Sequence, residues 1–275
     1  MAQYGLPALH GLLIWWFGTG LILFIDGLPP RTFRYSMAGA SVLLVGALAA
    51  LRFSAADTTT GGAYLAFTAA VLVWAWLEVS FYLGYVTGPR RHACAPDCHG
   101  WRHFGHAIQA SLYHEIAILV LAAAVVGLTW GKPNQFGTWT FVVLWWMHQS
   151  ARLNVFLGVS NLNADFLPEH LAHLRSFFTY KPINLLFPAS VTVSTLVAFV
   201  LGQNAAGAAD AFGATGYVLL ATMMVLAILE HWFLVLPISA ARVWNGLWEW
   251  SLGARAKAPR ESRPLPRQAP FGGRP

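Results

Sequence analysis

The sequence contains little charge and little cysteine. Aspartate, glutamate, lysine and arginine make up 10% of its 275 residues, whereas soluble domains carry about 25%. The two cysteines, Cys94 and Cys98, are too few and too close together for a disulfide framework. Segments of about ten residues with strict polar–apolar alternation, which would indicate a membrane β-barrel, are also missing. These absences point away from a soluble domain, a disulfide-stabilised domain and a barrel.

Long apolar runs take the place of charge. Hydrophobic residues make up 57% of the chain, and runs of about 20 apolar residues are typical of helices that cross a bilayer. The first run lacks a basic leading region and a small-residue cleavage site, so we do not expect a cleavable signal peptide. The sequence predicts an all-α, polytopic membrane helical bundle within residues 1–252, with about seven transmembrane helices at residues 6–24, 35–51, 63–86, 107–130, 137–160, 185–201 and 215–238.

Two segments outside these runs have patterns of their own. Between the fifth and sixth runs, Leu167, Leu171, Leu174 and Phe178 recur at helical spacing, which predicts a short helix lying on the membrane surface. Residues 253–275 are basic and rich in proline, which predicts a disordered cytoplasmic tail. Each tail cation would be attracted to anionic lipid headgroups by about 1 kcal/mol, or the tail serves only as a topology signal. It does not indicate nucleic-acid binding.

The distribution of lysine and arginine predicts the orientation. Connections on one side of the predicted bundle carry only Arg52 and Lys132. The opposite side carries Arg31, Arg34, Arg90, Arg91, Arg102, Arg175, Lys181, Arg242 and the six cations of the tail. Because positive residues accumulate on the cytoplasmic side of a membrane protein, we expect the amino terminus outside and the carboxy terminus in the cytoplasm.

Ionisable side chains lie inside the predicted spans. Each costs roughly 2.5–3.5 kcal/mol at membrane depth on insertion scales, so it usually faces a partner, a cavity or a site. Counted at 1.5 Å per residue, these residues lie roughly 10–18 Å from the cytoplasmic end, in one layer. The layer contains Glu78, His114, Glu115, His148, Arg152, Glu230 and His231. His103 and His106, on the same predicted helix face as His114, would lie below it.

This layer has three interpretations. Carboxylates and imidazoles converging from several helices build carboxylate-bridged metal pairs, and they suit iron, zinc or manganese. The candidate metal ligands are Glu78, His114, Glu115, His148, Glu230 and His231. A hydrogen-bonded network that fixes helix register, with Arg152 pairing Glu78 or Glu115, is the structural alternative. A neutral histidine can also be an axial ligand to the magnesium of a bacteriochlorophyll or the iron of a haem. The candidate cofactor-binding residues are His106, His114, His148 and Arg152.

The connector before the fourth run is dense in sulfur and imidazole. It reads HACAPDCHGWRHFGH and contains His92, Cys94, Cys98, His99, His103 and His106. A Cys-x-x-x-Cys pair with nearby histidines is a candidate zinc site. The proline and aspartate in the spacer, together with reduced cytoplasmic thiols, are equally compatible with a plain loop.

Four segments of the chain resemble a known family. YHEIAILV, HQSARLNVFLGVSN, FLPEHLAHLRSFF and KPINLLFP are similar to the PuhE-type photosynthetic complex assembly proteins of purple phototrophic bacteria. The resemblance extends from the first predicted span through the seventh, and it brings no catalytic residues with it. It implies a multi-pass protein of the bacterial inner membrane, cytoplasmic or intracytoplasmic, encoded near the reaction-centre H subunit.

Three classes of function follow from these observations. The resemblance implies an integral membrane assembly factor for reaction-centre or light-harvesting complexes, which modulates bacteriochlorophyll supply. Its partners would be the subunits of those complexes, pigment and the lipid bilayer. The polar layer supports a membrane-embedded metal-dependent enzyme, an oxygenase or hydrolase acting on a lipid, tetrapyrrole or carotenoid. A transporter is disfavoured, because the sequence shows no inverted repeat and no paired broken helices.

Overall fold

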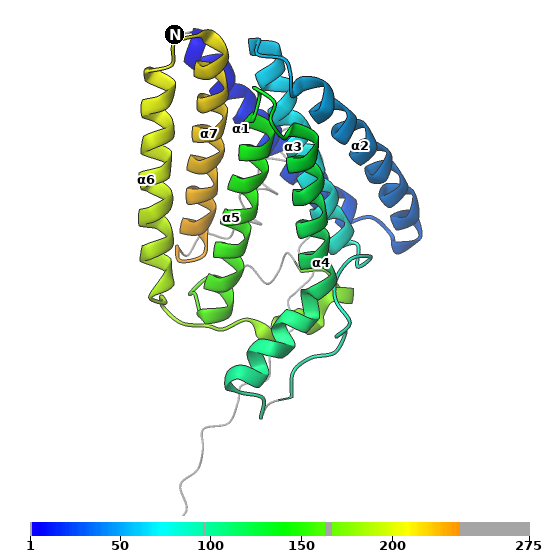
Figure 1. The fold of residues 1–275 in the computed structure, drawn as a ribbon. Helices are drawn as coiled ribbons and strands as arrows, with labels where there is room; N and C mark the ends of the chain where they lie inside the picture. The colour runs from blue at the N-terminus through cyan, green and yellow to red at the C-terminus, as the bar shows by residue number, and fades with distance from the viewer. Residues whose placement is uncertain (1, 96, 163–166, 237–275) are drawn as a thin grey trace, which may run out of the picture.

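A computed structural model describes residues 2–95, 97–162 and 167–236, and the predicted all-α bundle is confirmed in them (Figure 1). The end of the predicted seventh span, an expected amphipathic continuation to Trp250 and the predicted tail at residues 253–275 lie outside the described residues. The described part contains no strand, and its α-helices are α1 (Ala2–Asp26), α2 (Phe33–Ser54), α3 (Thr60–Tyr82), α4 (Gly100–Thr129), α5 (Phe136–Leu157), α6 (Leu186–Ala206) and α7 (Ala211–Phe233). Two short 3₁₀ helices, η1 (Pro30–Thr32) and η3 (Glu169–Phe177), connect them.

Six of these α-helices are long and apolar enough to cross a membrane, so the chain is a multi-pass membrane protein. The exception by composition is α5, which carries His148, Gln149, Arg152 and Asn154 in its second half. This helix is as long as α2 and packs against α3, α4, α6 and α7. Its polar side chains therefore face protein neighbours as well as the outside of the bundle. Seven spans, with α5 as one of them, remain our prediction.

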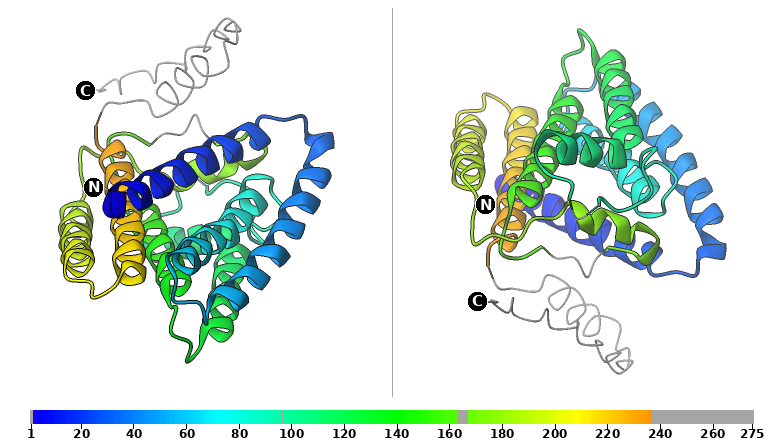
Figure 2. Two further views of the ribbon diagram at one scale, coloured as in Figure 1. Left: turned by 90° about the horizontal axis from the view of Figure 1, so that it is seen from above. Right: turned by 90° about the horizontal axis from the view of Figure 1, so that it is seen from below.

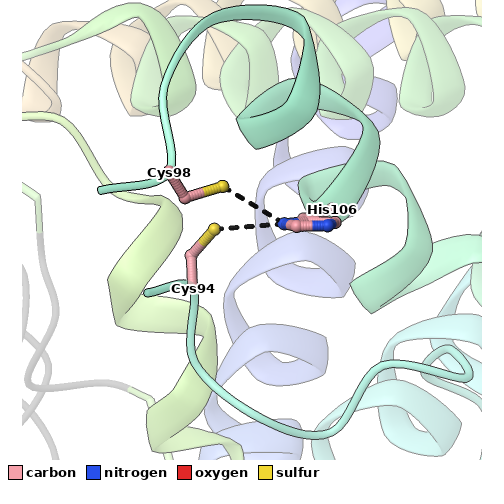
Figure 3. A group of neighbouring side chains, drawn as sticks. All are labelled: Cys94, Cys98 and His106. Carbon is pink, nitrogen blue, oxygen red and sulfur yellow. Dashed lines mark hydrogen bonds between the residues drawn. The ribbon is translucent and has the colours of Figure 1, made fainter. Parts of the chain in front are cut away.

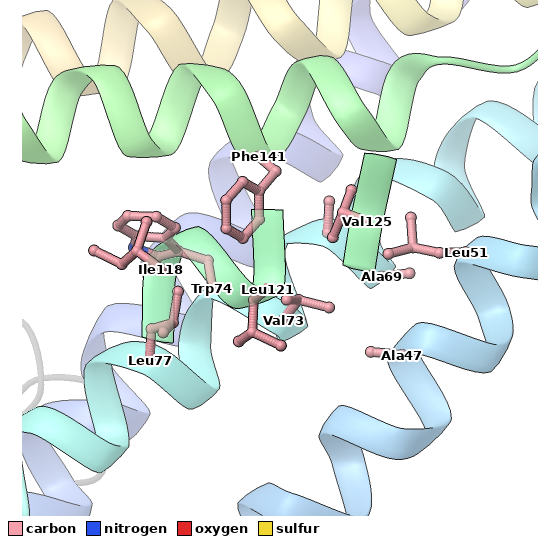
Figure 4. Close-up of a cluster of buried hydrophobic side chains, with 11 residues drawn as sticks. Ala47, Leu51, Ala69, Val73, Trp74, Leu77, Ile118, Leu121, Val125 and Phe141 are labelled. Carbon is pink, nitrogen blue, oxygen red and sulfur yellow. The ribbon is translucent and has the colours of Figure 1, made fainter. Parts of the chain in front are cut away.

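The centre of the bundle is formed by α3 and α7. About half of each apolar stretch is buried, 50% in α3 and 56% in α7, against 11% in α1 and in α2. Small residues along α3, including Ala63, Ala66, Ala69 and Ala70, are fully buried, and they let neighbouring helices approach closely. One buried cluster joins α3 to α2, α4 and α5 (Figure 4). Side chains from α3 therefore meet those of nearly every other helix.

Asn134 ties two connections together at one end of the bundle. Its side-chain Nδ2, with two hydrogens to share, lies 3.0 Å from each of the carbonyl oxygens of Ser54, Asp57 and Gly62, and its side-chain oxygen accepts the Phe136 backbone N–H. The α4–α5 connection is thereby fixed on the α2–α3 turn. Arg52 lies in the last turn of α2 and Lys132 in the α4–α5 connection, so the two cations lie at the same end.

The other end is built from longer connections. Asn161 reaches the carboxyl end of α7, where its side-chain amide donates to the carbonyl of Phe233, the last helix residue, and to that of Leu236 just beyond the helix. Asn184 accepts the backbone N–H groups of Leu186 and Phe187 at the start of α6 and donates to the Gly158 carbonyl. Seen from below, η3 runs across this end near α1 and α4 (Figure 2).

The short helix after α5 is a 3₁₀ helix, and its buried face differs from the expected one. Leu171 and Leu174 are buried as the spacing predicted, but the third member is Phe177 and not Phe178. A 3₁₀ helix has three residues per turn, so side chains at intervals of three line up on one face. These three side chains pack on Ala110 of α4.

Candidate functional site

Glu78, His114 and His148 converge between α3, α4 and α5. One ligand-type atom from each residue lies within 4.8 Å of the other two. His148 Nδ1 is 3.4 Å from Glu78 Oε1, and the His114 and His148 rings are 5.5 Å apart. Ligand atoms held at about 2.0–2.2 Å in a tetrahedral site lie about 3.3–3.6 Å apart. The Glu78–His148 pair already has this spacing, and the other ligand atoms would have to move closer to share an ion.

His114 is positioned by a bend in α4. The connector after α3 runs against the helix here: the His114 backbone N–H donates to the Thr87 carbonyl at 3.0 Å, and the Arg90 N–H donates to the Gln109 carbonyl. Gly88 passes so close to the backbone of α4 that a Cβ would clash. Figure 1 shows the first half of α4 set at an angle to the second. Sharp bends are expected where another group enters the hydrogen-bond ladder of a helix.

Three of the four imidazole nitrogens in this group have no hydrogen-bond partner. His114 is 1% exposed, and neither of its ring nitrogens makes a hydrogen bond; the same is true of His148 Nε2. An aromatic ring packs on each histidine: the ring centroid of Phe81 lies 4.7 Å from that of His114, and the ring centroid of Trp74 lies 5.3 Å from that of His148. Buried polar groups are normally satisfied, so nitrogens left open in an aromatic pocket favour a bound metal or ligand.

A cavity of about 460 Å³ adjoins this group. Glu78 and His148 line one side, and Glu230 and His231 of α7 line the other. Its remaining wall is largely aromatic and aliphatic, including Trp15, Trp74, Tyr82, Leu144 and Met223. Small-molecule sites have this character: mostly apolar walls, a few placed polar groups and a volume of about 300–1,000 Å³.

Glu230 and His231 border the cavity but are bound to other partners. Glu230 Oε1 accepts the indole N–H of Trp15 on α1 at 2.9 Å. His231 is 2% exposed; its Nε2 lies 2.9 Å from Ser150 Oγ and its Nδ1 lies 2.9 Å from the Ala227 carbonyl. The structure thus places these two candidate ligands at the cavity and outside the group formed by Glu78, His114 and His148.

Glu115 and Arg152 form a separate group between α4 and α5. Arg152 donates to the carboxylate of Glu115 and to the Ser111 hydroxyl, and Gln149 donates to the same carboxylate. Neighbouring residues on a helix point about 100° apart, so Glu115 faces α5 at a different position from His114. For this pair the structure fits a hydrogen-bonded network between helices, with Arg152 paired to Glu115.

His106 lies apart from the central group. It is two turns nearer the start of α4, and its Nδ1 is 3.3 Å from Cys94 Sγ and 3.2 Å from Cys98 Sγ (Figure 3). His103, which shares its helix face, packs on the rings of Phe156 and Phe177. Desolvation and the neighbouring Cys98 thiol raise the pKa of Cys94.

Several side chains that complete these groups were not expected. Trp15 hydrogen-bonds to Glu230, and Ser150 hydrogen-bonds to His231. Gln149 hydrogen-bonds to Glu115, and Ser111 accepts a hydrogen bond from Arg152. None of these side chains is ionisable at membrane depth, so the cost of burying charge does not single them out in the sequence. A hydrogen-bonding partner on another helix becomes apparent only once the helices are packed.

A bundle of long apolar helices with a partly buried histidine–glutamate group between α3, α4 and α5 defines a multi-pass membrane protein with a candidate metal or cofactor site. The chain belongs to the family described as "Protein of unknown function (DUF3623)", whose model matches residues 1–259. A relative from Rhodobacter capsulatus, described as an uncharacterized 30.4 kDa protein in the puhA 5′ region, is 38% identical over 272 residues. The match covers 97% of this chain and 98% of the relative. No solved structure matches the chain.

Proposed function

We propose that this protein is an integral membrane assembly factor for the photosynthetic reaction-centre or light-harvesting complexes of a phototrophic bacterium. The observation that carries the proposal is the Rhodobacter capsulatus relative, which is 38% identical over nearly its whole length and is described by its position in the puhA 5′ region. The resemblance to PuhE-type proteins supports the same function. The protein acts in the inner membrane, where such complexes are built.

The cavity supports the second part of the proposal, a role in pigment supply. Its wall is mostly aromatic and aliphatic, and His148, with an open Nε2, lines it. A neutral imidazole in an apolar bundle is suited to bind the magnesium at the centre of a bacteriochlorophyll. The factor modulates bacteriochlorophyll supply by holding part of the pigment at this cavity while a complex forms.

Deletion of the gene in its phototrophic host tests the assembly function. We expect the absorbance of the reaction-centre and antenna complexes to fall or to appear late, while respiratory growth stays normal, because only the photosynthetic complexes need the factor. A plasmid copy of the intact gene should restore the absorbance, which controls for effects on neighbouring genes. Equal pigment–protein levels in the deletion strain and its parent under phototrophic conditions would contradict the proposal.

A second candidate function is favoured by the group of Glu78, His114 and His148. Two imidazoles and a carboxylate from three helices, with ligand atoms within 4.8 Å, suit iron or zinc. With a metal there and the cavity beside it, the protein would be a metal-dependent oxygenase or hydrolase acting on a lipid, tetrapyrrole or carotenoid. Metal at this group in the purified protein separates this function from assembly alone.

A further inference from the structure

We propose that Cys94, Cys98 and His106 bind a zinc ion, at a site separate from the group formed by Glu78, His114 and His148. The two thiols and the imidazole nitrogen all lie within 4.8 Å of one another. Both sulfur atoms point at the same ring nitrogen, at 3.3 and 3.2 Å (Figure 3). In a tetrahedral zinc site with Zn–S of about 2.3 Å and Zn–N of about 2.0–2.1 Å, sulfur and nitrogen are about 3.5 Å apart.

Hydrogen bonding alone does not account for this geometry. His106 Nδ1 carries at most one hydrogen, so it donates fully to only one of the two sulfurs, and thiols are weak partners. When three ligands bind one ion, each ligand atom lies close to both of the others. The approach of two sulfur atoms to one ring nitrogen fits that arrangement. Thiolate and imidazole ligands together select zinc over magnesium and calcium, which prefer oxygen. Binding releases the two thiol protons to solvent, so the thiolates carry the charge that the cation neutralises.

The surrounding structure holds the ligands in place from three segments. Cys98 is 5% exposed although it lies in a connector without regular structure. The Cys94 backbone N–H donates to Ser176 Oγ of η3 at 3.0 Å, and Cys94 packs beside the buried face of η3. His106 comes from the first half of α4. An ion here would join the connector, η3 and α4 into one rigid unit.

Among the described residues, three ligands converge and a fourth protein ligand does not. His103 is turned onto Phe156 and Phe177, and His99 is exposed. The fourth position of a zinc ion would therefore be taken by water or by a small ligand from outside. Closed zinc sites with four protein ligands are structural, and three ligands with an open position are found in catalytic sites.

Zinc bound through His106 would also affect the group formed by Glu78, His114 and His148, because His106 and His114 lie on the same helix. His114 follows His106 by eight residues on the same helix, about 12 Å along its axis. An ion that fixes the start of α4 also fixes the bend from which His114 faces Glu78 and His148. This inference stands whether the protein assembles complexes or catalyses a reaction.

Zinc content and cobalt substitution of the full-length protein test the proposal. The protein is purified in detergent under reducing conditions and its zinc is measured by mass spectrometry. It is then stripped with a chelator and reloaded with Co²⁺, whose charge-transfer absorption reports thiolate ligands. We expect one ion held by cysteine, and loss of that ion and of the absorption in Cys94→Ser and Cys98→Ser. His106→Gln should weaken binding at least about tenfold, since even partners outside the ligand shell are worth 10–100-fold.

Matched variants separate this site from its surroundings. His99→Ala removes an exposed imidazole of the same connector and should keep the ion. Glu78→Gln and His148→Ala should also keep the cobalt–thiolate absorption, because they alter only the other group. Wild-type protein that takes up no cobalt with thiolate absorption overturns the proposal, as does an ion count unchanged in Cys94→Ser. A Cys94–Cys98 disulfide in protein alkylated before purification overturns it too, and each of these results leaves the assembly function standing.

Discussion

Arg152 of α5 donates to the carboxylate of Glu115 on α4, and this pair accounts for two of the charges that lie within apolar stretches of the chain. Ser111 and Gln149 complete the group. The relationship matters for the central site because it keeps Arg152 occupied beside His148. The ion-pair partner of Glu78 is instead His148, whose Nδ1 lies 3.4 Å from the Glu78 carboxylate.

Removing one member of the pair should destabilise the bundle. Arg152→Met leaves the Glu115 carboxylate unpaired in a partly buried position. Breaking a fully buried pair costs about 3–5 kcal/mol, but these side chains are 33% and 25% exposed, so we expect about 1–3 kcal/mol. The measurement is the temperature at which half of the detergent-solubilised protein is lost from its monodisperse peak.

The double variant provides the control. Arg152→Met with Glu115→Gln removes both charges and should recover most of the lost stability, because no charge remains unpaired. If Arg152→Met is as stable as the wild type, the pair contributes nothing to folding. If the double variant is only as stable as Arg152→Met, the loss comes from packing around the arginine stem and not from an unpaired charge.

The all-α class of the fold could be predicted from the sequence, and the partners of the polar side chains could not. The long apolar runs defined the all-α bundle, and the cost of charge in hydrocarbon identified the polar residues that meet inside it. Which residues meet depends on how each helix is rotated about its axis. His114 and Glu115 are neighbours in the sequence, yet one faces Glu78 and His148 and the other faces Arg152. Trp15 holds Glu230 from a helix whose sequence carries no signal for that contact.

The same limit applies to local geometry. The spacing of leucines after α5 fits both an α-helix and a 3₁₀ helix until the last turn, where Phe177 takes the place expected for Phe178. The bend of α4 arises from contacts with Thr87, Gly88 and Arg90 of the connector. Both features come from tertiary packing, which overrides the periodicity that a sequence pattern assumes.

Changing His148 distinguishes a metal site from a packing network. If Glu78, His114 and His148 bind a metal, His148→Ala should lower the metal content not held by cysteine while the amount of folded protein stays nearly unchanged. If they are only a network, the same change leaves Glu78 without its 3.4 Å partner, and the amount of folded protein should fall instead. Metal analysis and the monodisperse yield from membranes are measured on the same preparation.

Glu230→Gln is the matched control for this experiment. Glu230 borders the same cavity, but its carboxylate is engaged by Trp15, and a glutamine oxygen can accept the same indole N–H. This variant should keep both the metal and the yield. A loss of metal equal to that of His148→Ala would show that Glu230 is a ligand and that the three-residue group is incomplete.

The direction of the bundle in the membrane is the last prediction, and the structure sharpens it. The α2–α3 turn and the α4–α5 connection, bound together through Asn134, form one end with Arg52 and Lys132 as its cations. Arg90 and Arg91 precede α4 at the other end, where the connector meets η3 through Cys94 and Ser176. Since cations accumulate in the cytoplasm, the end that carries Asn134 should face outward.

Reporter fusions check this orientation. A reporter active only outside the cytoplasm should give a signal when it is inserted in the 203–213 region, which contains the turn between α6 and α7, and no signal when it follows Pro275. A reporter active only in the cytoplasm, placed at the same two positions, should give the opposite pattern and controls for expression. Signals from both positions on one side would mean that an even number of spans, or none, separates them. The reversed pattern would place the basic end outside, and the cysteine–histidine site would then lie in an oxidising compartment, where a disulfide competes with zinc for both thiols.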